Sequence, residues 1–321
     1  MKVLITGAAG FIGSHACEHF IDSGYQVAGL DNFDDFYSRS IKENNLKTVK
    51  ESDRFVFHEG DIRDESLLKK IFDNNSFDLV IHLAAKAGVR PSIYNVKEYY
   101  DVNVNGTLNI LEAMRVHNVK KLIFASSSSV YGNNSRLPFS ESDPVDNPVS
   151  PYASTKKSGE LLCHVYTHLY GFDVTCLRFF TVYGPRQRPD LAIHKFTRLI
   201  DEGKTVDLYG DGSTARDYTY IDDIIEGIGR AAGRLKGYNI YNLGESDMID
   251  LLSMVKVIEE YLGKKALLNY SPVQPGDVKK TYADILKAKT ELGYDPGYDF
   301  RKGMGKFIEW YRENRKPAAA R

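Results

Sequence analysis

The chain has 321 residues, of which 42% are hydrophobic and 26% are charged, an ordinary composition for a globular protein. Its 42 basic and 43 acidic residues leave a net charge of −1, so bulk charge indicates neither nucleic-acid binding nor an anionic membrane surface. Because the three cysteines form no Cys-x-x-Cys pair and no apolar run reaches membrane-span length, we expect a cytoplasmic enzyme with no metal site.

Strands and helices alternate through the first half of the chain. A short apolar run at residues 3–6 precedes a glycine-rich turn, after which Ile12, Ala16 and Phe20 recur at helical spacing until Gly24. Further strands are expected at residues 27–30, 55–57, 79–83, 122–125 and 174–179. This rhythm predicts an α/β fold with a Rossmann-like, doubly wound parallel sheet, in which ligands bind at the carboxyl ends of the strands.

The first turn has the features of a dinucleotide site. Gly7, Gly10 and Gly13 permit a tight turn and close approach of a pyrophosphate to the N-terminus of the following helix. Their spacing differs by one position from Gly-x-Gly-x-x-Gly, so the turn alone is a weak signal. Asp31 ends the next strand, where its carboxylate can accept hydrogen bonds from ribose hydroxyls and would repel a 2′-phosphate. Together these residues predict NAD rather than NADP.

Two later strand ends fit the same ligand. Asp61 and Ile62 can hold the adenine edge, although a carboxylate after a strand is more often a turn residue or a helix cap. The small side chains in Leu83-Ala84-Ala85-Lys86 leave room for the pyrophosphate.

A helix is expected to begin at Ser150-Pro151, because serine is a good N-cap and proline suits the first helical position. Tyr152 then lies in the first turn, and Lys156 lies on the same face one turn later. A nearby ammonium favours the phenolate and lowers the pKa of the phenol, so Tyr152 is a candidate base. Many helices carry Tyr-x-x-x-Lys by chance, with the tyrosine on the surface and the lysine solvated. We expect the same helix to present an apolar stripe to the core: Leu161, Val165 and Leu169.

The strand at 122–125 runs into four serines, Ser126, Ser127, Ser128 and Ser129. Their hydroxyls follow a central strand and therefore face the expected ligand crevice, where one of them can hydrogen-bond the reacting oxygen. The alternative is an ordinary serine-rich turn.

After Thr181 the pattern changes to turn-rich stretches with short strands at 206–209 and 240–243. We interpret this part as a smaller mixed α/β domain that ends in a helix from Phe300 to about Arg315. The predicted division is an NAD-binding domain at 1–180, a nucleotide-sugar-binding domain at 181–316 and a tail at 317–321. We leave open that some segments of the second domain return to the first.

The glycine turn, the serines and the Tyr-x-x-x-Lys helix together resemble the extended short-chain dehydrogenase/reductase superfamily. Within it, blocks in family order resemble the UDP-glucuronate 4-epimerases across essentially the whole chain. These blocks are residues 30–33, 87–90, 125–132, 177–185, 188–190, 216–223 and 276–277.

The resemblance implies a tightly held NAD and assigns roles to individual residues. It implies a catalytic set of Ser127, Tyr152 and Lys156. It implies cofactor contacts from Gly7, Gly10, Phe11, Ile12, Gly13, Asp31, Asn32, Asp61, Ile62, Leu83, Ala84, Ala85, Lys86, Asn103, Ser126, Tyr152, Lys156, Phe179 and Val182. It implies substrate contacts from Arg90, Ser127, Ser128, Ser129, Tyr152, Thr181, Arg188, Arg216 and Asp277. For Arg90 and Arg188, a diphosphate contact or a surface ion pair is the more ordinary role.

Single positions separate the related chemistries. The family's nucleotide-sugar dehydratases carry an Asp-Glu pair where this chain has Ser128 and Ser129, and the sugar-acid decarboxylases carry Glu at the second place. The UDP-galactose 4-epimerases carry Asn where this chain has Thr181, whose small hydroxyl leaves room for a C5 carboxylate. Gln274 departs from an arginine that many relatives place near the diphosphate, which leaves Arg216 as the main phosphate candidate.

The predicted function is therefore NAD-dependent C4 epimerisation of a UDP-sugar, UDP-glucuronate to UDP-galacturonate, through a transient 4-keto intermediate. One alternative is a UDP-glucose or UDP-N-acetylglucosamine 4-epimerase. Another is a silent dinucleotide-binding regulator, although such proteins usually lose the tyrosine or lysine that this chain keeps. The resemblance also implies a homodimer that pairs through the Tyr152 helix and the helix near residues 100–117. Composition and charge, in turn, predict no nucleic-acid or membrane partner.

Overall fold

The computed structural model describes residues 1–272 and 280–315. Gln274, Asp277 and the tail at 317–321 lie outside the described residues, so the predictions made for them are not examined further.

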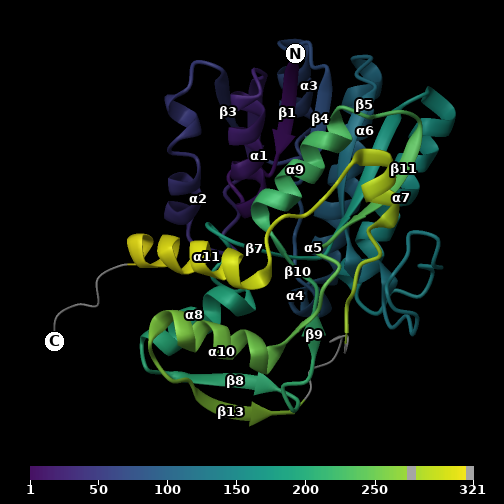
Figure 1. Ribbon diagram of the computed structural model, residues 1–321. Coiled ribbons are helices and arrows are strands. Elements are labelled where there is room, and N and C mark those ends of the chain that lie inside the picture. Colours follow the sequence, from purple (N-terminus) through teal and green to yellow (C-terminus); the bar gives the residue numbers. More distant parts are fainter. Residues whose placement is uncertain (273–279, 316–321) are drawn as a thin grey trace.

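The centre of the fold is a seven-stranded sheet with the strand order β11-β6-β5-β4-β1-β2-β3, and every neighbouring pair is parallel (Figure 1). The predicted doubly wound parallel sheet is therefore confirmed. The strands are β1 (Lys2–Thr6), β2 (Gln26–Asp31), β3 (Phe55–Glu59), β4 (Leu79–His82), β5 (Lys121–Ser127), β6 (Asp173–Phe179) and β11 (Tyr238–Leu243).

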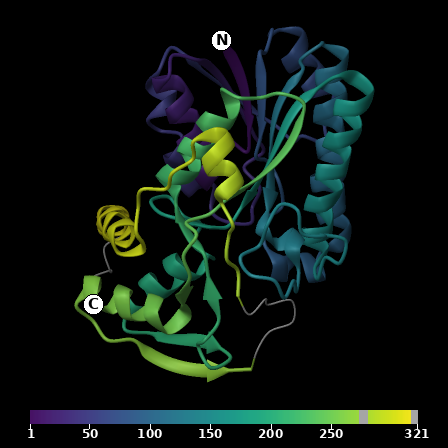
Figure 2. The ribbon, with the colours of Figure 1, turned by 45° about the vertical axis from the view of Figure 1, so that its right-hand side comes forward.

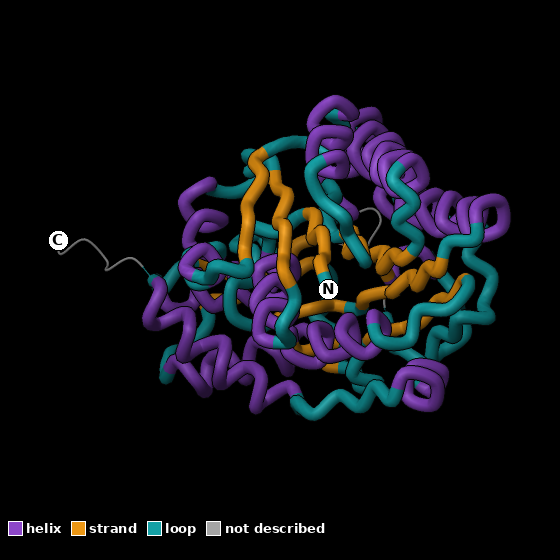
Figure 3. The backbone as a smooth tube through the Cα atoms, turned by 90° about the horizontal axis from the view of Figure 1, so that it is seen from above, coloured by secondary structure: helices purple, strands orange, loops and turns teal. Residues whose placement is uncertain are grey.

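Helices cover both faces of this sheet, so its strands lie between two helical layers (Figure 3). Side chains alternate along a strand, and in β1 Val3 and Ile5 face one core while Leu4 faces the other. The first core receives α1 (Phe11–Asp22) and α9 (Ile221–Ala232). The second receives α3 (Glu65–Asp73), α6 (Gly106–Val116) and α7 (Pro151–Tyr170).

Short elements join the strands. On the β2 side these are α2 (Arg39–Asn45) and the 3₁₀ turn η1 (Val49–Glu51). Beyond β4 they are α4 (Val89–Tyr94), α5 (Val96–Tyr100) and the π-helical turn η2 (Asp101–Asn105), and after β5 comes the 3₁₀ turn η3 (Ser128–Tyr131).

A smaller unit lies beyond the carboxyl edge of the sheet, below it in Figure 1. Its helices are α8 (Ala192–Asp201), α10 (Leu251–Leu262) and α11 (Phe300–Asn314), and the π-helical turn η4 (Ala288–Leu292) packs back against the large sheet. Its strands pair two by two, β8 (Thr205–Tyr209) with β13 (Leu267–Ser271), β7 (Thr181–Tyr183) with β10 (Tyr218–Tyr220), and β9 (Ala215–Arg216) with β12 (Ile249–Asp250).

The strand at 240–243, which follows the predicted domain boundary, lies in β11 and pairs with β6 at the edge of the large sheet, so this segment returns to the first part of the fold. One local expectation was wrong. The stripe of Leu161, Val165 and Leu169 on α7 does not enter the core, because these side chains are 55%, 44% and 61% exposed. The sheet packs instead against the opposite face of α7, which carries Lys156 and Glu160.

Within the described ranges, no helix is both long and apolar enough to cross a membrane.

Candidate active site

A cavity of about 370 Å³ opens at the carboxyl edge of the sheet, between the large sheet and the smaller unit. Every predicted cofactor residue except Asn103 lines it. Those lining residues are Gly7, Gly10, Phe11, Ile12, Gly13, Asp31, Asn32, Asp61, Ile62, Leu83, Ala84, Ala85, Lys86, Ser126, Tyr152, Lys156, Phe179 and Val182.

The glycine turn is shaped as a cradle that other residues would fill. Gly7 has φ +71°, a left-handed conformation that favours glycine. A Cβ on Gly13 would lie 2.0 Å from the carbonyl oxygen of Gly7, so only glycine lets α1 begin this close to β1. The first amides of α1 then face the cavity, as a pyrophosphate requires. These residues therefore fit a dinucleotide.

Asp31 is oriented by the turn itself. Its carboxylate accepts hydrogen bonds from the backbone N–H of Ala9 at 3.0 Å and of Phe33 at 2.8 Å. Burial raises the pKa of Asp31, and these hydrogen bonds and Lys42 oppose that shift. The carboxylate lines the cavity at the end of β2, where the sequence predicted a ribose contact.

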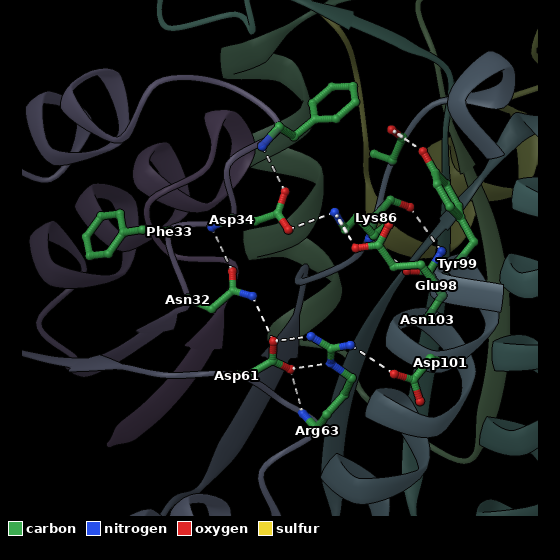
Figure 4. Close-up of polar contacts among 12 residues, drawn as sticks. Asn32, Phe33, Asp34, Asp61, Arg63, Lys86, Glu98, Tyr99, Asp101 and Asn103 are labelled. Carbon is green, nitrogen blue, oxygen red and sulfur yellow. Dashed lines mark hydrogen bonds and ion pairs between the residues drawn. The ribbon is translucent and has the colours of Figure 1, made fainter. Parts of the chain in front are cut away.

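Asp61 follows β3, the strand next to β2, and is held from two sides (Figure 4). The Arg63 guanidinium hydrogen-bonds it at 2.8 and 2.9 Å, and Asn32 Nδ2 donates to it at 2.8 Å. The Arg63 hydrogen bond is the main reason that the pKa of Asp61 falls to about 2. A fixed anion at this position can accept from an adenine amino group.

Sequence reasoning missed much of the wall at this end of the cavity. Asp34, Phe36 and Tyr37 follow β2, and Lys42 comes from α2. No motif distinguished them in the sequence, although Asp34, Phe36 and Tyr37 follow the carboxyl end of β2. The remaining lining residues that were not predicted are Leu30, Gly60, Ala87, Gly88, Val102, Ala125, Phe180 and Leu191.

Asn103 acts behind the cavity wall. From the π-helical turn, its Oδ1 accepts from Lys86 N at 2.8 Å, and its Nδ2 donates to Lys86 O and to Thr155 Oγ1, both at 3.0 Å. It thereby joins the loop after β4 to the helix that carries Tyr152, and π-turns are frequent at such functional positions.

Ser127, Tyr152 and Lys156 come together at the other end of the cavity. Ser150 caps α7 by accepting from Ala153 N at 3.1 Å, which confirms the predicted helix start and places Tyr152 in the first turn. The buried Lys156 donates from Nζ to Ala125 O at 2.7 Å. The helix and β5 thus hold the three side chains on one wall.

The electrostatics of Tyr152 differ from the expectation. Burial raises its pKa, and a hydrogen bond from Ser127 and the charge of Arg188 lower it by a smaller amount. Lys156 is committed to the Ala125 carbonyl, and burial lowers its own pKa to about 8. The hydrogen bond from Ser127, rather than the ammonium of Lys156, is therefore the main influence that lowers the pKa of Tyr152.

A buried ion pair contacts Ser126, the first of the four serines. Arg178 on β6 donates to Glu160 on α7 at 2.8 and 2.9 Å, and both side chains are 1% exposed. Ser126 Oγ donates to the same carboxylate at 2.6 Å. Three segments that carry site residues, β5, β6 and α7, are thereby joined.

The predicted substrate residues divide into two groups. Thr181 and Arg188 line the cavity together with Ser127 and Tyr152, and Arg188 also forms a bidentate ion pair with Asp190. The others are not among the described lining residues. Ser128 and Ser129 lie in η3, Arg90 stacks on the ring of Tyr209 at 4.5 Å, and Arg216 Nη1 donates to Ala215 O.

Among residues 1–272 and 280–315, no three His, Cys, Asp or Glu side chains are grouped so as to hold a metal ion. The three cysteines are free and buried.

Comparison with known proteins agrees with this geometry. The profile of the GDP-mannose 4,6 dehydratase family matches residues 4–307. The chain is 45% identical to a UDP-glucuronate 4-epimerase of Thermodesulfobacterium geofontis, covering 97% of this chain and 96% of that protein.

Two solved structures are also similar over nearly their full length. A UDP-glucuronic acid 4-epimerase from Bacillus cereus, in complex with UDP-glucuronic acid and NAD, matches with a TM-score of 0.92 at 39% identity, over 98% of this chain and 99% of that one. A UDP-glucose 4-epimerase from Thermotoga maritima, with UDP-glucose, matches with a TM-score of 0.90 at 33% identity, over the same shares of the two chains.

Proposed function

The chain belongs to the NAD-dependent epimerases and dehydratases of the extended short-chain dehydrogenase/reductase family, and we propose that within this family it interconverts UDP-glucuronate and UDP-galacturonate. It is a UDP-sugar 4-epimerase by class. The observation that carries the finer assignment is that Ser127, Thr181 and Arg188 line one cavity with Tyr152, so that hydroxyls and a cation surround the candidate base.

The protein's own groups supply the proton transfer. Tyr152 takes the proton of the C4 hydroxyl and returns it after the sugar has turned over, while Ser127 hydrogen-bonds both the phenol and the sugar oxygen. Lys156, which donates to Ala125 O, would bind the nicotinamide ribose. The chemistry that NAD would supply when bound is reversible hydride transfer at C4 of the sugar.

The residues that follow Ser127 argue against water elimination. A dehydratase needs an acid or base beside the serine position, and this chain has Ser128 and Ser129 there, with only hydroxyls. An inverted product formed without loss of water is therefore expected, although the matching family profile is named for a dehydratase.

A 4-keto sugar with a C5 carboxylate readily loses carbon dioxide, so an epimerase for uronates must hold that carboxylate in its charged form. The hydroxyl of Thr181 can donate to a carboxylate, and Arg188 adds a positive charge. Because Asp190 already pairs with Arg188, we expect the Thr181 hydroxyl to contribute most of the recognition.

A UDP-glucose 4-epimerase is the second candidate, because the similarity to the Thermotoga maritima enzyme is nearly as high over the same coverage. The two candidates share the reaction and differ in the group on C5.

The test is a comparison of UDP-glucuronate, UDP-glucose and UDP-N-acetylglucosamine, with the products resolved by chromatography. We expect UDP-glucuronate to have the highest kcat/KM. A higher value for UDP-glucose would replace the uronate assignment with the neutral-sugar one.

Thr181→Val sharpens this test, because it keeps the shape of the side chain and removes its hydroxyl. Losing a hydrogen bond to a charged group costs about 1.5–3 kcal/mol, so kcat/KM on UDP-glucuronate should fall roughly ten- to a hundredfold. UDP-glucose should lose less. An equal loss on both substrates would mean that Thr181 does not read the carboxylate.

A further inference from the structure

Lys86 stands between two carboxylates at the rim of the cavity (Figure 4). Its Nζ lies 2.8 Å from Asp34 Oδ2, in the loop after β2, and 2.8 Å from Glu98 Oε1, on α5. The Lys86 side chain is 14% exposed, so water screens these pairs less than it screens ordinary surface pairs. Burial alone would lower the pKa of Lys86, but its two partners raise it above the usual value.

The strand order shows which two loops this ion pair connects. In the sheet β1 lies between β2 and β4, so the loops that follow β2 and β4 flank the glycine turn that follows β1. Asp34 belongs to the first loop and Lys86 to the second, and both line the cavity together with Gly7 and Gly13. Their contact therefore joins the two rims of the cradle across the place where a pyrophosphate fits.

The loop that supplies Asp34 is itself held in a defined shape. Asn32 Oδ1 accepts from Asp34 N at 3.0 Å, and Asp34 Oδ1 accepts from Phe36 N at 3.0 Å. These side-chain turns leave Asp34 Oδ2 directed toward Lys86 (Figure 4).

A second chain of polar contacts runs parallel to the first. Asn32 bonds Asp61, Asp61 bonds Arg63, and Arg63 Nη1 reaches Asp101 at 2.9 Å (Figure 4). Asp101 follows Glu98 by three residues, so both chains end on the same helical segment, one turn apart. The loop after β2 is thus attached to the α5–η2 segment at two points.

We propose that the Asp34–Lys86–Glu98 ion pairs form a clasp that closes over the bound dinucleotide and slows its release. The proposal rests on the proposed function, because it takes the cavity to be the NAD site. Retention has a clear purpose in that reaction: the cofactor ends each cycle in the form in which it began, so it need not exchange.

Substituting Glu98 tests the clasp separately from the cavity wall. It is not among the described residues that line the cavity, so it acts on the cofactor only through Lys86. Lys86→Gln would instead combine loss of the clasp with loss of a cavity wall. Asp34→Asn would do the same, because Asp34 also lines the cavity. The experiment therefore uses Glu98→Gln.

The measurement is the rate at which NAD already bound to the intact enzyme exchanges for isotopically labelled NAD. We expect Glu98→Gln to exchange on the order of three- to tenfold faster than the unaltered protein. The KM for the UDP-sugar should stay unchanged, since Glu98 is not among the described residues that line the cavity.

Glu260→Gln is the matched control. Glu260 pairs with Arg301 at 2.7 Å on the smaller unit and is 41% exposed, close to the 44% of Glu98, so it loses a comparable pair away from the cavity. Exchange in Glu98→Gln at the rate of Glu260→Gln would overturn the clasp. An unaltered protein that binds no NAD at all would instead overturn the proposed function, so the two failures are distinguishable.

Discussion

Tyr152 is the residue on which the proposed chemistry depends, and its environment both hinders and assists ionisation. Burial raises the pKa of the phenol, whereas the Ser127 hydrogen bond and the charge of Arg188 lower it. The phenol lines the cavity and lies in the first turn of α7, next to Ser127. This arrangement suits a group that exchanges a proton with a sugar hydroxyl.

Tyr152→Phe removes the hydroxyl and keeps the ring. We expect turnover to fall by about 10²- to 10⁴-fold, which is the usual contribution of a positioned acid–base group, while NAD remains bound. Denaturing the purified variant and separating the released dinucleotide measures retention. Near-normal turnover would refute the assignment of the base, and NADP as the main dinucleotide would refute the role given to Asp31.

Glu245 is a second residue whose environment has a measurable consequence. It follows β11, and burial, assisted by Asp223 and Asp217, raises its pKa to about 8. In the unfolded chain a glutamate titrates near 4.3. The folded protein therefore holds an extra proton between these two values, and its stability should decline as the pH rises from about 4 to about 8.

Glu245→Gln removes this titration. We expect the variant to gain thermal stability relative to the unaltered protein as the pH rises, with the largest difference above pH 8. Melting temperatures between pH 5.5 and 9 measure the effect, and Glu260→Gln serves as a surface control. A difference that shrinks with rising pH would contradict the argument.

At the scale of elements, α7 is the part on which the site is built. Its first turn carries Tyr152, its next turn carries Lys156, and the turn after that carries Glu160, so three functional side chains recur every four residues on the face toward the sheet. Glu160 then fixes the helix against β6 through Arg178 and against β5 through Ser126. The ion pair and the Ser126 hydrogen bond thereby hold α7 against both strands.

Glu160→Gln leaves the Arg178 guanidinium buried without its counter-charge. Removing one partner of a buried pair typically costs about 3–5 kcal/mol, and we expect a loss of that size in urea unfolding. The double variant Glu160→Met/Arg178→Met removes both charges and should recover much of it. A single-variant loss no larger than that of Asp73→Asn, which breaks a surface pair with Lys69, would show that the pair is not important for stability.

At the scale of the whole molecule, the exposed stripe of α7 predicts an assembly. Leu161, Val165 and Leu169 lie on the outer face of the helical layer, and α6 adds Leu108 and Val116, which are 37% and 66% exposed. The blue and teal helices of this layer line the right-hand side of Figure 2. Apolar side chains on two adjacent helices are the surface that a second copy of the chain can cover as a four-helix bundle.

We therefore expect a homodimer at micromolar concentration, and Leu161→Glu should shift it toward monomer because it buries a charge in the interface. Light scattering measures both states. Leu267→Glu on β13 is the control, since Leu267 is 58% exposed and Leu161 is 55% exposed, yet β13 lies in the smaller unit. A monomeric unaltered protein, or equal effects of the two variants, would contradict the predicted interface.

The sequence alone determined the features that depend on near neighbours. The glycine turn, the Ser150 cap and the spacing of Tyr152 and Lys156 each involve residues a few positions apart, where backbone sterics and helical periodicity decide the outcome. The alternating strands and helices likewise determined a parallel sheet with its ligand edge.

Only the tertiary structure decided which faces and which distant groups meet. The spacing of Leu161, Val165 and Leu169 defines an apolar stripe, but it does not say whether the sheet or a second chain covers it. Asp34 and Lys86 are far apart in sequence and meet because β1 separates their strands by one position. The way the helices and the sheet pack together decides which charged side chains meet. The spacing of residues within one segment does not determine which residues of another segment pack against it.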